Sequence, residues 1–198
     1  MTFTPQIPHW GAKNNQYSEK LYEYHSWLLD TGVKNGLISN KNKQLVWDEF
    51  IIHSLYFGII IRKVDKPINQ VYDLGTGGGI PGIPVAITNP NILFKLVDIS
   101  ESRVYELERL KSILGLKNIE IIRKDAKSIL SDHNLYISRC YISSKEALSL
   151  IKSNKNTTYI VSSNGEDLDH DKNMFHVKQE NFMINSTDLR HIDVITVR

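Results

Sequence analysis

Apolar residues recur at helical spacing in the first part of the chain. Between residues 18 and 29, Leu21, Tyr24 and Leu28 lie three and four positions apart, which places their side chains on one face of a helix. Residues 44–62 are more densely apolar at the same spacing. We therefore predict two helices in this region.

After residue 69 the pattern changes to short apolar runs separated by helical segments. The clearest helix covers residues 101–114, where Ser100 can cap the start and Gly115 can close the end. Strands that alternate with helices predict parallel βαβ units in a doubly wound sheet. Residues 175–179 and 191–198 have no helix of their own and predict a C-terminal antiparallel hairpin. The five buried strands are expected at residues 71–74, 93–98, 119–123, 135–139 and 158–162.

This change of pattern predicts an N-terminal helical cap, residues 1–69, and an α/β core, residues 70–198, within one domain unit. A chain of 198 residues, 41% hydrophobic and 23% charged, can bury a core without metals or disulfides. The formal net charge of +2 excludes a polybasic protein of the kind that coats DNA. Any contact with nucleic acid must therefore come from a local patch.

The cysteine, histidine and apolar residues bear on three questions: cellular location, metal binding and membrane contact. The only cysteine, Cys140, excludes an internal disulfide framework and predicts a cytoplasmic location; at the end of an apolar strand, we expect it to be buried. The seven histidines show no metal-ligand spacing, so no metal is expected. The most apolar stretch, residues 50–61, is shorter than the roughly 20 residues of a membrane span, so no membrane contact is expected.

The strongest chemical signal is a glycine-rich segment after the first predicted strand. Glycines let the backbone approach a ligand closely at the carboxyl edge of a sheet, where open α/β folds bind nucleotides. Two cofactor hypotheses compete. Asp73 followed by Gly75-x-Gly77-x-Gly79 fits the loop of S-adenosylmethionine-dependent methyltransferases. The series Gly77-x-Gly79-x-x-Gly82 fits the dinucleotide fingerprint, which would indicate a nicotinamide-dependent oxidoreductase.

The chemistry of the two cofactors favours the first hypothesis. A pyrophosphate is anionic and prefers bare amides at a helix N-terminus, so the Asp73 carboxylate would repel it. S-adenosylmethionine carries an ammonium and a sulfonium group, which the same carboxylate attracts. The first glycine after the strand is Gly75, whereas the dinucleotide match starts two residues later, at Gly77.

Two further strand ends carry candidate ligand contacts. Asp98 ends the second strand about 20 residues beyond the loop, where a carboxylate can accept both hydroxyls of a ribose. Alternatively, Asp98 helps to cap the helix after Ser100. The polar residues 123–127 follow the third strand, the usual place for contacts to an adenine ring.

Four segments resemble the bacterial small-subunit ribosomal RNA guanine-N7 methyltransferase family, formerly the glucose-inhibited division protein B family. They read DLGTGGGIPGIP at residues 73–84, LVDISESR at 96–103, ISRC at 137–140 and RHIDVI at 190–195. The glycine and proline continuation of the loop is the most specific element. The match extends in order from about residue 44 to the end.

The resemblance implies a class I, Rossmann-like methyltransferase core, S-adenosylmethionine as methyl donor and guanine N7 of small-subunit rRNA as acceptor. It implies no general base, because guanine N7 keeps an in-plane lone pair and catalysis consists of positioning. It also implies a monomer that acts on small-subunit rRNA or on the small ribosomal subunit. Together, the loop chemistry and the resemblance give the predicted cofactor residues Asp73, Gly75, Gly77, Gly79, Ile80, Asp98, Ala126, Lys127 and Arg139.

Arg139 is expected at the mouth of the site, or alternatively as a structural partner of Asp73. Several outer positions differ from the family pattern: in its His-x-x-Asp-Ser-Leu motif, the histidine falls on Phe50 and the aspartate on His53. A second hypothesis is therefore a divergent module that binds S-adenosylmethionine or RNA without turnover.

Overall fold

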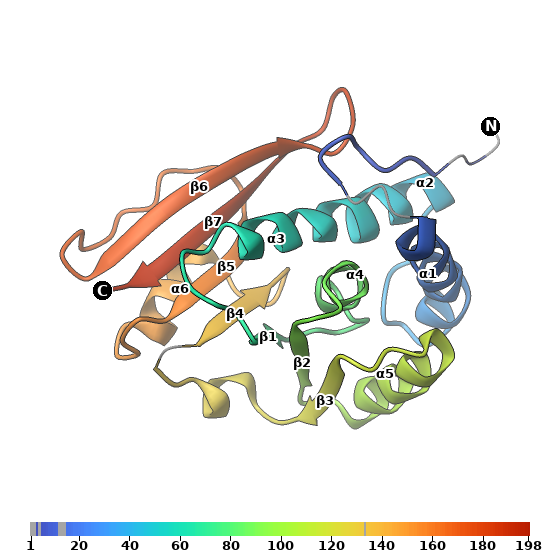
Figure 1. The fold of residues 1–198 in the computed structure, drawn as a ribbon, viewed down its shortest axis with the longest axis horizontal. Helices are drawn as coiled ribbons and strands as arrows, with labels where there is room; N and C mark the ends of the chain where they lie inside the picture. Colours follow the sequence, from blue (N-terminus) through green and yellow to red (C-terminus); the bar gives the residue numbers. More distant parts are fainter. Residues whose placement is uncertain (1–2, 4, 12–14, 133) are drawn as a thin grey trace.

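A computed structural model describes residues 3, 5–11, 15–132 and 134–198. Within these residues seven strands form one sheet in the order β3-β2-β1-β4-β5-β7-β6 (Figure 1). The first five strands are parallel, β7 is antiparallel to β5, and β6 is antiparallel to β7. The strands are β1 Gln70–Leu74, β2 Leu93–Asp98, β3 Ile119–Arg123, β4 Leu135–Ser138, β5 Thr158–Ser163, β6 Phe175–Met183 and β7 Leu189–Val197.

This sheet confirms the prediction of a mostly parallel, doubly wound sheet that ends in an antiparallel hairpin. The hairpin strands are longer than expected, and β4 ends one residue earlier, at Ser138. Strands β4 and β5 are apolar in continuous runs because helices cover both faces of a parallel sheet. The helical segments are α1 Asn15–Trp27, η1 Leu28–Gly32, α2 Lys43–Val46, η2 Trp47–Ile52, α3 His53–Arg62, α4 Gly82–Thr88, α5 Glu101–Leu114, η3 Ala126–Ile129 and α6 Ser144–Ile151.

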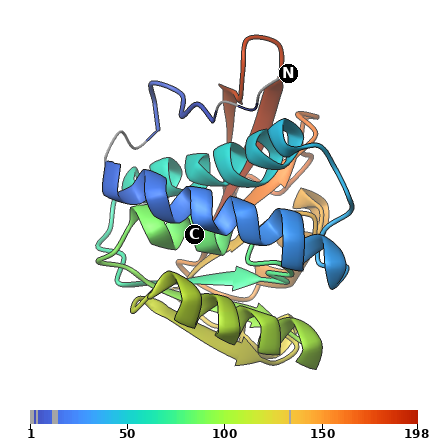
Figure 2. The same ribbon diagram turned by 90° about the vertical axis from the view of Figure 1, so that its right-hand side faces the viewer.

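Two layers of helices enclose the sheet. On one face, α1, α3, α4 and α5 bury their apolar side chains in a core shared with β1, β2 and β4. On the other face, α6 and η3 pack against β4, β5 and the hairpin. Figure 2 shows α1 running beside α4 and the long N-terminal helix, with α5 below them. The helices of residues 15–62 thus bury apolar side chains in the same core as the sheet.

The segments α2, η2 and α3 form one continuous helix, Lys43–Arg62, whose middle part is π-helical. This helix has 20 residues and is long and apolar enough to cross a membrane. However, 67% of its most apolar window is buried inside the protein. It therefore serves as a core helix that lies across the sheet.

The two ends of α5 are formed by the residues predicted to cap it, Ser100 and Gly115. Gly115 closes the helix in the left-handed conformation, with φ of +59°, as predicted. Ser100 is the N-cap residue, but its side chain makes no capping hydrogen bond. Instead, its amide donates to Oδ1 of Asp98 at 2.9 Å. The carboxylate at the end of β2 thus takes part in starting the helix.

Candidate cofactor and acceptor site

Strand β1 runs directly into the glycine loop at the centre of the sheet. Asp73 lies opposite Leu96 of β2 and Ile137 of β4. Gly75, Gly77 and Gly79 have φ of +67°, +58° and +88°, in the left-handed region that residues with a Cβ rarely adopt. Three alternate glycines therefore turn the chain back across the carboxyl ends of the strands.

Asp73 is completely buried beneath this loop. Its Oδ2 accepts hydrogen bonds from the Thr76 hydroxyl at 2.6 Å and the Gly82 amide at 2.8 Å. Its Oδ1 is buried and has no hydrogen-bond partner among the described residues. Burial raises the pKa of Asp73 to about 7, against the effect of its two hydrogen bonds and with a contribution from the charge of Asp98. A cationic group nearby would stabilise the ionised carboxylate.

The close approach of Asp73 also explains Gly82. A Cβ atom at Gly82 would lie 2.5 Å from Oδ2 of Asp73 and would collide with Leu96. Only glycine fits at this first residue of α4. Gly82 completes the dinucleotide match in the sequence, so the packing of Asp73 accounts for it without a bound pyrophosphate.

Asp98, at the end of β2, connects the glycine loop to the start of α5. Its Oδ2 accepts from the Gly77 amide at 3.0 Å and forms an ion pair with Arg103 at 3.3 Å. Its Oδ1 accepts from the amide of Ser100. The structure thus places Asp98 beside the predicted loop and also gives it the capping contact that was the alternative.

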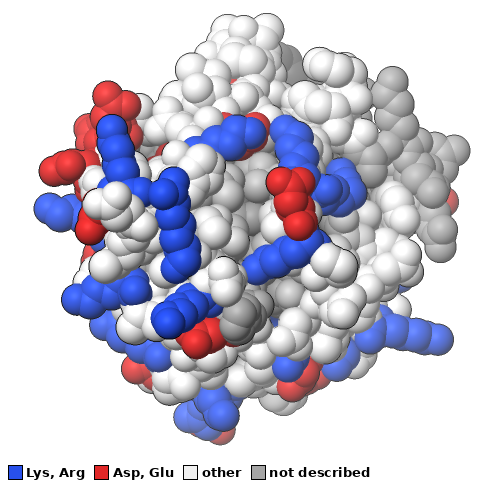
Figure 3. Space-filling model, turned by 60° about the vertical axis from the view of Figure 1, so that its left-hand side comes forward, with Lys and Arg blue, Asp and Glu red and all other residues white. Residues whose placement is uncertain are grey.

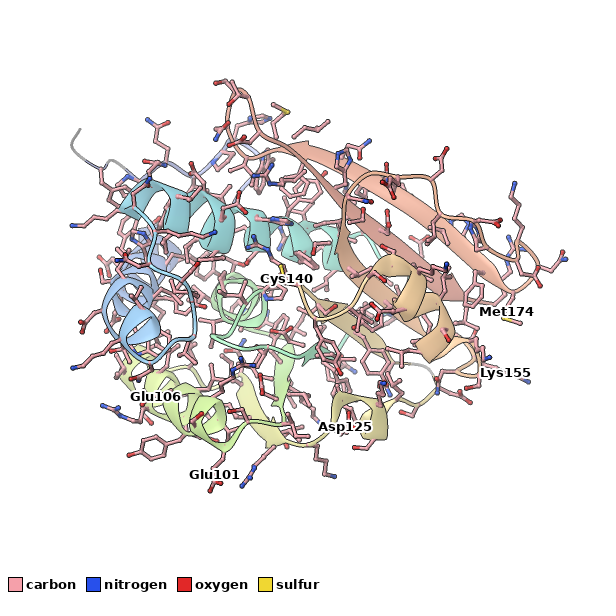
Figure 4. All side chains as sticks on the ribbon, turned by 180° about the vertical axis from the view of Figure 1, so that it is seen from behind. Glu101, Glu106, Asp125, Cys140, Lys155 and Met174 are labelled. Atoms are coloured by element: carbon pink, nitrogen blue, oxygen red, sulfur yellow. The ribbon has the colours of Figure 1, made fainter. Side chains whose placement is uncertain are left out.

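The loop after β3 lies at the same edge of the sheet. Asp125 accepts a hydrogen bond from the Lys127 amide at 3.0 Å, which caps the short helix η3. Ala126 is buried in this turn, whereas the Lys127 side chain is exposed. Ile80, in the glycine loop, is partly buried against the main core. Figure 4 labels Asp125, which lies two residues after β3, and Cys140, which lies two residues after β4.

Arg139 pairs with a residue that the sequence did not single out. Its Nη2 lies 2.8 Å from Oε2 of Glu49, in the long N-terminal helix, and its Nη1 donates to the Glu49 backbone carbonyl. Arg190 of β7 contacts the other oxygen of the same carboxylate. The carboxylate partner of Arg139 is therefore Glu49 rather than Asp73. One carboxylate thus joins the cap, β4 and the hairpin.

Phe50 and His53 lie beside this network. The Phe50 ring is 5.2 Å from the guanidinium of Arg139 and 5.2 Å from the ammonium of Lys41. His53 is buried, and neither ring nitrogen has a hydrogen-bond partner among the described residues. Burial lowers the pKa of His53 well below its usual value, and the positive charges of Arg139 and Arg190 add to this effect. The imidazole is thus held neutral.

The residues after β4 correct one sequence prediction. Cys140 is exposed rather than buried, because β4 ends at Ser138 and Cys140 turns with φ of +58°. This turn places the Tyr141 ring directly against Gly75, where a Cβ atom would collide with it. Burial raises the pKa of the Tyr141 hydroxyl, and the nearby charges of Asp125 and Asp98 add to this.

The structure therefore brings the predicted loop residues, Asp98, the η3 turn and Arg139 to one edge of the sheet. Sequence reasoning missed Tyr141, Glu49 and the role of Tyr24, whose hydroxyl contacts the loop. The only feature of the sequence that could have pointed to Tyr141 is its position two residues after Arg139. Among the described residues no cluster of three or more His, Cys, Asp or Glu side chains is arranged to hold a metal ion.

Comparison with solved structures shows the fold. Magnesium protoporphyrin IX methyltransferase from Synechocystis PCC 6803 superposes with a TM-score of 0.53 at 15% identity, over 89% of this chain and 99% of that one. A putative methyltransferase, yhhF, from Escherichia coli superposes with a TM-score of 0.51 at 13% identity, over 72% and 82% of the two chains. The predicted class I, Rossmann-like methyltransferase fold is confirmed.

Comparison of sequences shows the family. The ribosomal RNA small subunit methyltransferase G of Flavobacterium johnsoniae is 31% identical over 137 residues, which are 69% of this chain and 63% of that protein. The protein of the same name from Bacteroides thetaiotaomicron is 29% identical, over 78% of this chain and 80% of its own length. The match to the first of these relatives thus spans less than two thirds of its length. The sequence model of rRNA small subunit methyltransferase G matches residues 17–195. The family predicted from the four sequence segments is thereby confirmed: this chain belongs to the rRNA small subunit methyltransferase G family.

Proposed function

We propose that this protein transfers a methyl group from S-adenosylmethionine to N7 of a guanine in small-subunit (16S) ribosomal RNA. The observation that carries the proposal is that Asp73, the glycine loop and Asp98 meet at one sheet edge. Membership in an rRNA methyltransferase family favours this function over a nicotinamide-dependent oxidoreductase. The packing of Gly82 against Asp73 removes the main support for the latter.

The residues at this edge fit the proposed methyl donor. The unpartnered Oδ1 of Asp73 is suited to a cationic group, and the donor has an ammonium and a sulfonium. At Gly77 a Cβ atom would project into open space beside the loop, so glycine keeps that space clear for a ligand, whereas Tyr141 and Ile83 fill the corresponding space at Gly75 and Gly79.

Oδ1 of Asp98 accepts only from the Ser100 amide and retains a lone pair that can accept a ribose hydroxyl. Oδ2 already accepts from the Gly77 amide and from Arg103, so a second ribose hydroxyl would take the place of the exposed Arg103. The proposed donor contacts remain Asp73, Gly75, Gly77, Gly79, Ile80, Asp98, Ala126, Lys127 and Arg139.

The proposed reaction asks the protein for orientation. When bound, S-adenosylmethionine supplies an electrophilic methyl group. Guanine N7 has a free in-plane lone pair, so no side chain has to remove a proton before attack. Orientation alone can lower a barrier substantially. Arg139, at the end of β4, and Phe50, which packs on it, are placed to border the entering nucleotide.

The proposal also covers the location of the protein, its oligomeric state, the form of its RNA substrate and its domain organisation. We expect a cytoplasmic monomer that acts on small-subunit rRNA or on the assembled small subunit. We also retain the division into a cap, residues 1–69, and a donor-binding core, residues 70–198. The burial of cap helices against the sheet supports a single folding unit.

The direct test is methyl transfer to defined RNA. Purified protein is incubated with labelled S-adenosylmethionine and with small subunits, or their RNA, from cells that lack the corresponding methyl group. Reduction followed by aniline cleavage then locates N7-methylguanine. We expect one labelled guanine. Label on another atom would contradict the acceptor assignment. Donor binding without methyl transfer would favour the divergent binding module instead.

A further inference from the structure

A groove lies where the end of α3 meets the outer strands of the sheet. It has a volume of about 350 Å³ and is lined by the turn after α3, the start of β5, and strands β6 and β7. The two-residue period of a strand explains which side chains face it. His176, Lys178 and Glu180 alternate along β6, and Val194 and Thr196 along β7.

Three lysines reach this groove from separate segments. Lys63 and Lys178 share a single carboxylate: their ammonium groups lie 3.4 Å and 2.6 Å from the two oxygens of Glu180. The ammonium of Lys66 donates to the backbone carbonyl oxygen of Asn156 at 3.0 Å. A carbonyl oxygen leaves the charge of Lys66 uncompensated. The direct contacts of the three lysines therefore leave at least one positive charge that is not neutralised.

The charge of the groove favours an anionic ligand. Its lining contains three lysines against two carboxylates, those of Asp65 and Glu180, with the ring of His176 beside them. On the face shown in Figure 3, Lys and Arg side chains gather around a hollow, with fewer acidic ones between them. Several ammonium groups along an open groove are typical of contacts to a nucleic-acid backbone, which position the nucleic acid without reading its sequence.

The groove lies at the opposite edge of the sheet from the glycine loop. Thr158, which lines it, is the first residue of β5, whereas the loop follows the last residue of β1. Strands of this length span roughly 17–20 Å. In Figure 4, Lys155 and Met174 lie on the groove side, and Cys140 lies towards the other edge. A single molecule that reaches both places must be at least as long as this distance.

We propose that this groove binds phosphate groups of the RNA substrate, as a second contact far from the methylated base. The inference rests on the proposed function, because it takes the ligand of the groove to be the methyl acceptor. Lys63, Lys66 and Lys178 contact phosphate oxygens, and bound RNA draws Lys63 and Lys178 away from Glu180. The contact adds affinity and holds the large RNA in register while the guanine lies at the other edge.

The test uses the double variant Lys66→Gln, Lys178→Gln, measured by filter binding to small-subunit RNA at several salt concentrations. Each lost phosphate contact reduces the slope of log Kobs against log salt by roughly 0.7–0.9. We therefore expect the slope to fall by about 1.5 and low-salt affinity to fall at least tenfold. Donor affinity and thermal stability should stay as in the wild type, because exposed ion pairs add little stability. Lys111→Gln, on α5 at the other side of the molecule, is the control.

RNA binding is measured without methyl transfer, so the two proposals fail separately. An unchanged salt slope in the double variant overturns the groove proposal, whatever the methylation assay gives. The same holds if Lys111→Gln reduces the slope equally. A third arm adds inorganic phosphate and adenosine monophosphate to protein without RNA. One result would show that the groove is a small-anion site and that the RNA assignment is wrong. In that result, phosphate or adenosine monophosphate raises the melting temperature of the wild type but not of the double variant, and the two proteins bind RNA equally well.

Discussion

The hydroxyl of Tyr24, in the N-terminal helix α1, donates a 2.8 Å hydrogen bond to the carbonyl oxygen of Gly78 in the glycine loop. Tyr24 is completely buried, and 54 residues separate the two partners. Cap side chains support the same glycine, since Leu28, Leu37 and Ile38 would all lie within 4 Å of a Cβ atom there. The cap therefore helps to fix the conformation of the loop that is proposed to hold the methyl donor.

Replacement of Tyr24 by Phe tests this support. The change leaves the Gly78 carbonyl without its partner, so we expect a loss of about 1–3 kcal/mol in the free energy of unfolding. We also expect a higher KM for S-adenosylmethionine with little change in kcat, because the loop is loosened while the reacting atoms are untouched. Tyr22→Phe, on the same helix but partly exposed, is the matched control. Equal KM values in the two variants would contradict a role in positioning the loop.

Asp73 predicts a pH dependence of stability with a definite sign. Its pKa is raised from the usual 3.8 to about 7, so the folded protein holds a proton that the unfolded chain releases between about pH 4 and 7. The stability that this group contributes is present below pH 4 and is lost as the pH rises to 7, by up to about 4 kcal/mol. Asp73→Asn keeps one side-chain oxygen that can accept from both Thr76 and Gly82, and it should flatten this part of the profile. Urea denaturation at pH 5 to 8 measures it; parallel profiles for wild type and variant would contradict the assignment.

The same carboxyl group should couple donor binding to pH. If the ionised form of Asp73 favours a cationic ligand, affinity for S-adenosylmethionine rises up to tenfold per pH unit until about pH 7, then levels off. Binding below pH 7 also releases a proton, which calorimetry in buffers of different ionisation enthalpy detects. Asp73→Asn should bind more weakly and without this dependence. A variant that retains the wild-type pH profile would assign the titration to another group.

Asp98 requires a test that separates its two roles. Asp98→Ala removes acceptors for the amides of both Gly77 and Ser100, so it should lower stability as well as donor affinity. The ribose contact is isolated by comparing S-adenosylhomocysteine with its 2′-deoxy analogue. Wild type should bind the deoxy compound more weakly, by about 1.5–3 kcal/mol for a hydrogen bond to a charged group. Asp98→Ala should bind both alike. A persistent difference in the variant would show that another residue holds the ribose.

Glu49 should be important for stability because it neutralises two arginines. The side chains of Arg139 and Glu49 are only 8% and 16% exposed, and removing one partner of a buried ion pair costs about 3–5 kcal/mol. We expect a loss near the lower end of this range for Glu49→Gln, measured by chemical denaturation, because Arg190 is partly exposed. Glu101→Gln breaks the exposed pair with Arg123 and should cost less than about 1 kcal/mol. Equal losses would contradict the network.

The sequence was sufficient to predict the succession of strands and helices after residue 69 and the backbone of the glycine loop. The switch from helical spacing to short apolar runs predicted each parallel strand to within about one residue. The alternate glycines after Asp73 predicted the loop, because only glycine readily adopts three left-handed positions so close together. These features depend on neighbours in the chain, so a local pattern records them.

Contacts between distant segments were decided only by the tertiary structure. Arg139 and Glu49 are 90 residues apart, and no local pattern indicated that Glu49 rather than Asp73 would pair with the guanidinium. Cys140 is exposed because β4 stops two residues before it, and the resulting turn, rather than any motif, places Tyr141 on Gly75. The lysine groove likewise joins α3, β5, β6 and β7, which meet only when the sheet closes over the long helix. The physical reason is the same in each case: periodicity and glycine conformation are set by adjacent residues, whereas a partner's identity depends on which side chains the packed elements bring together.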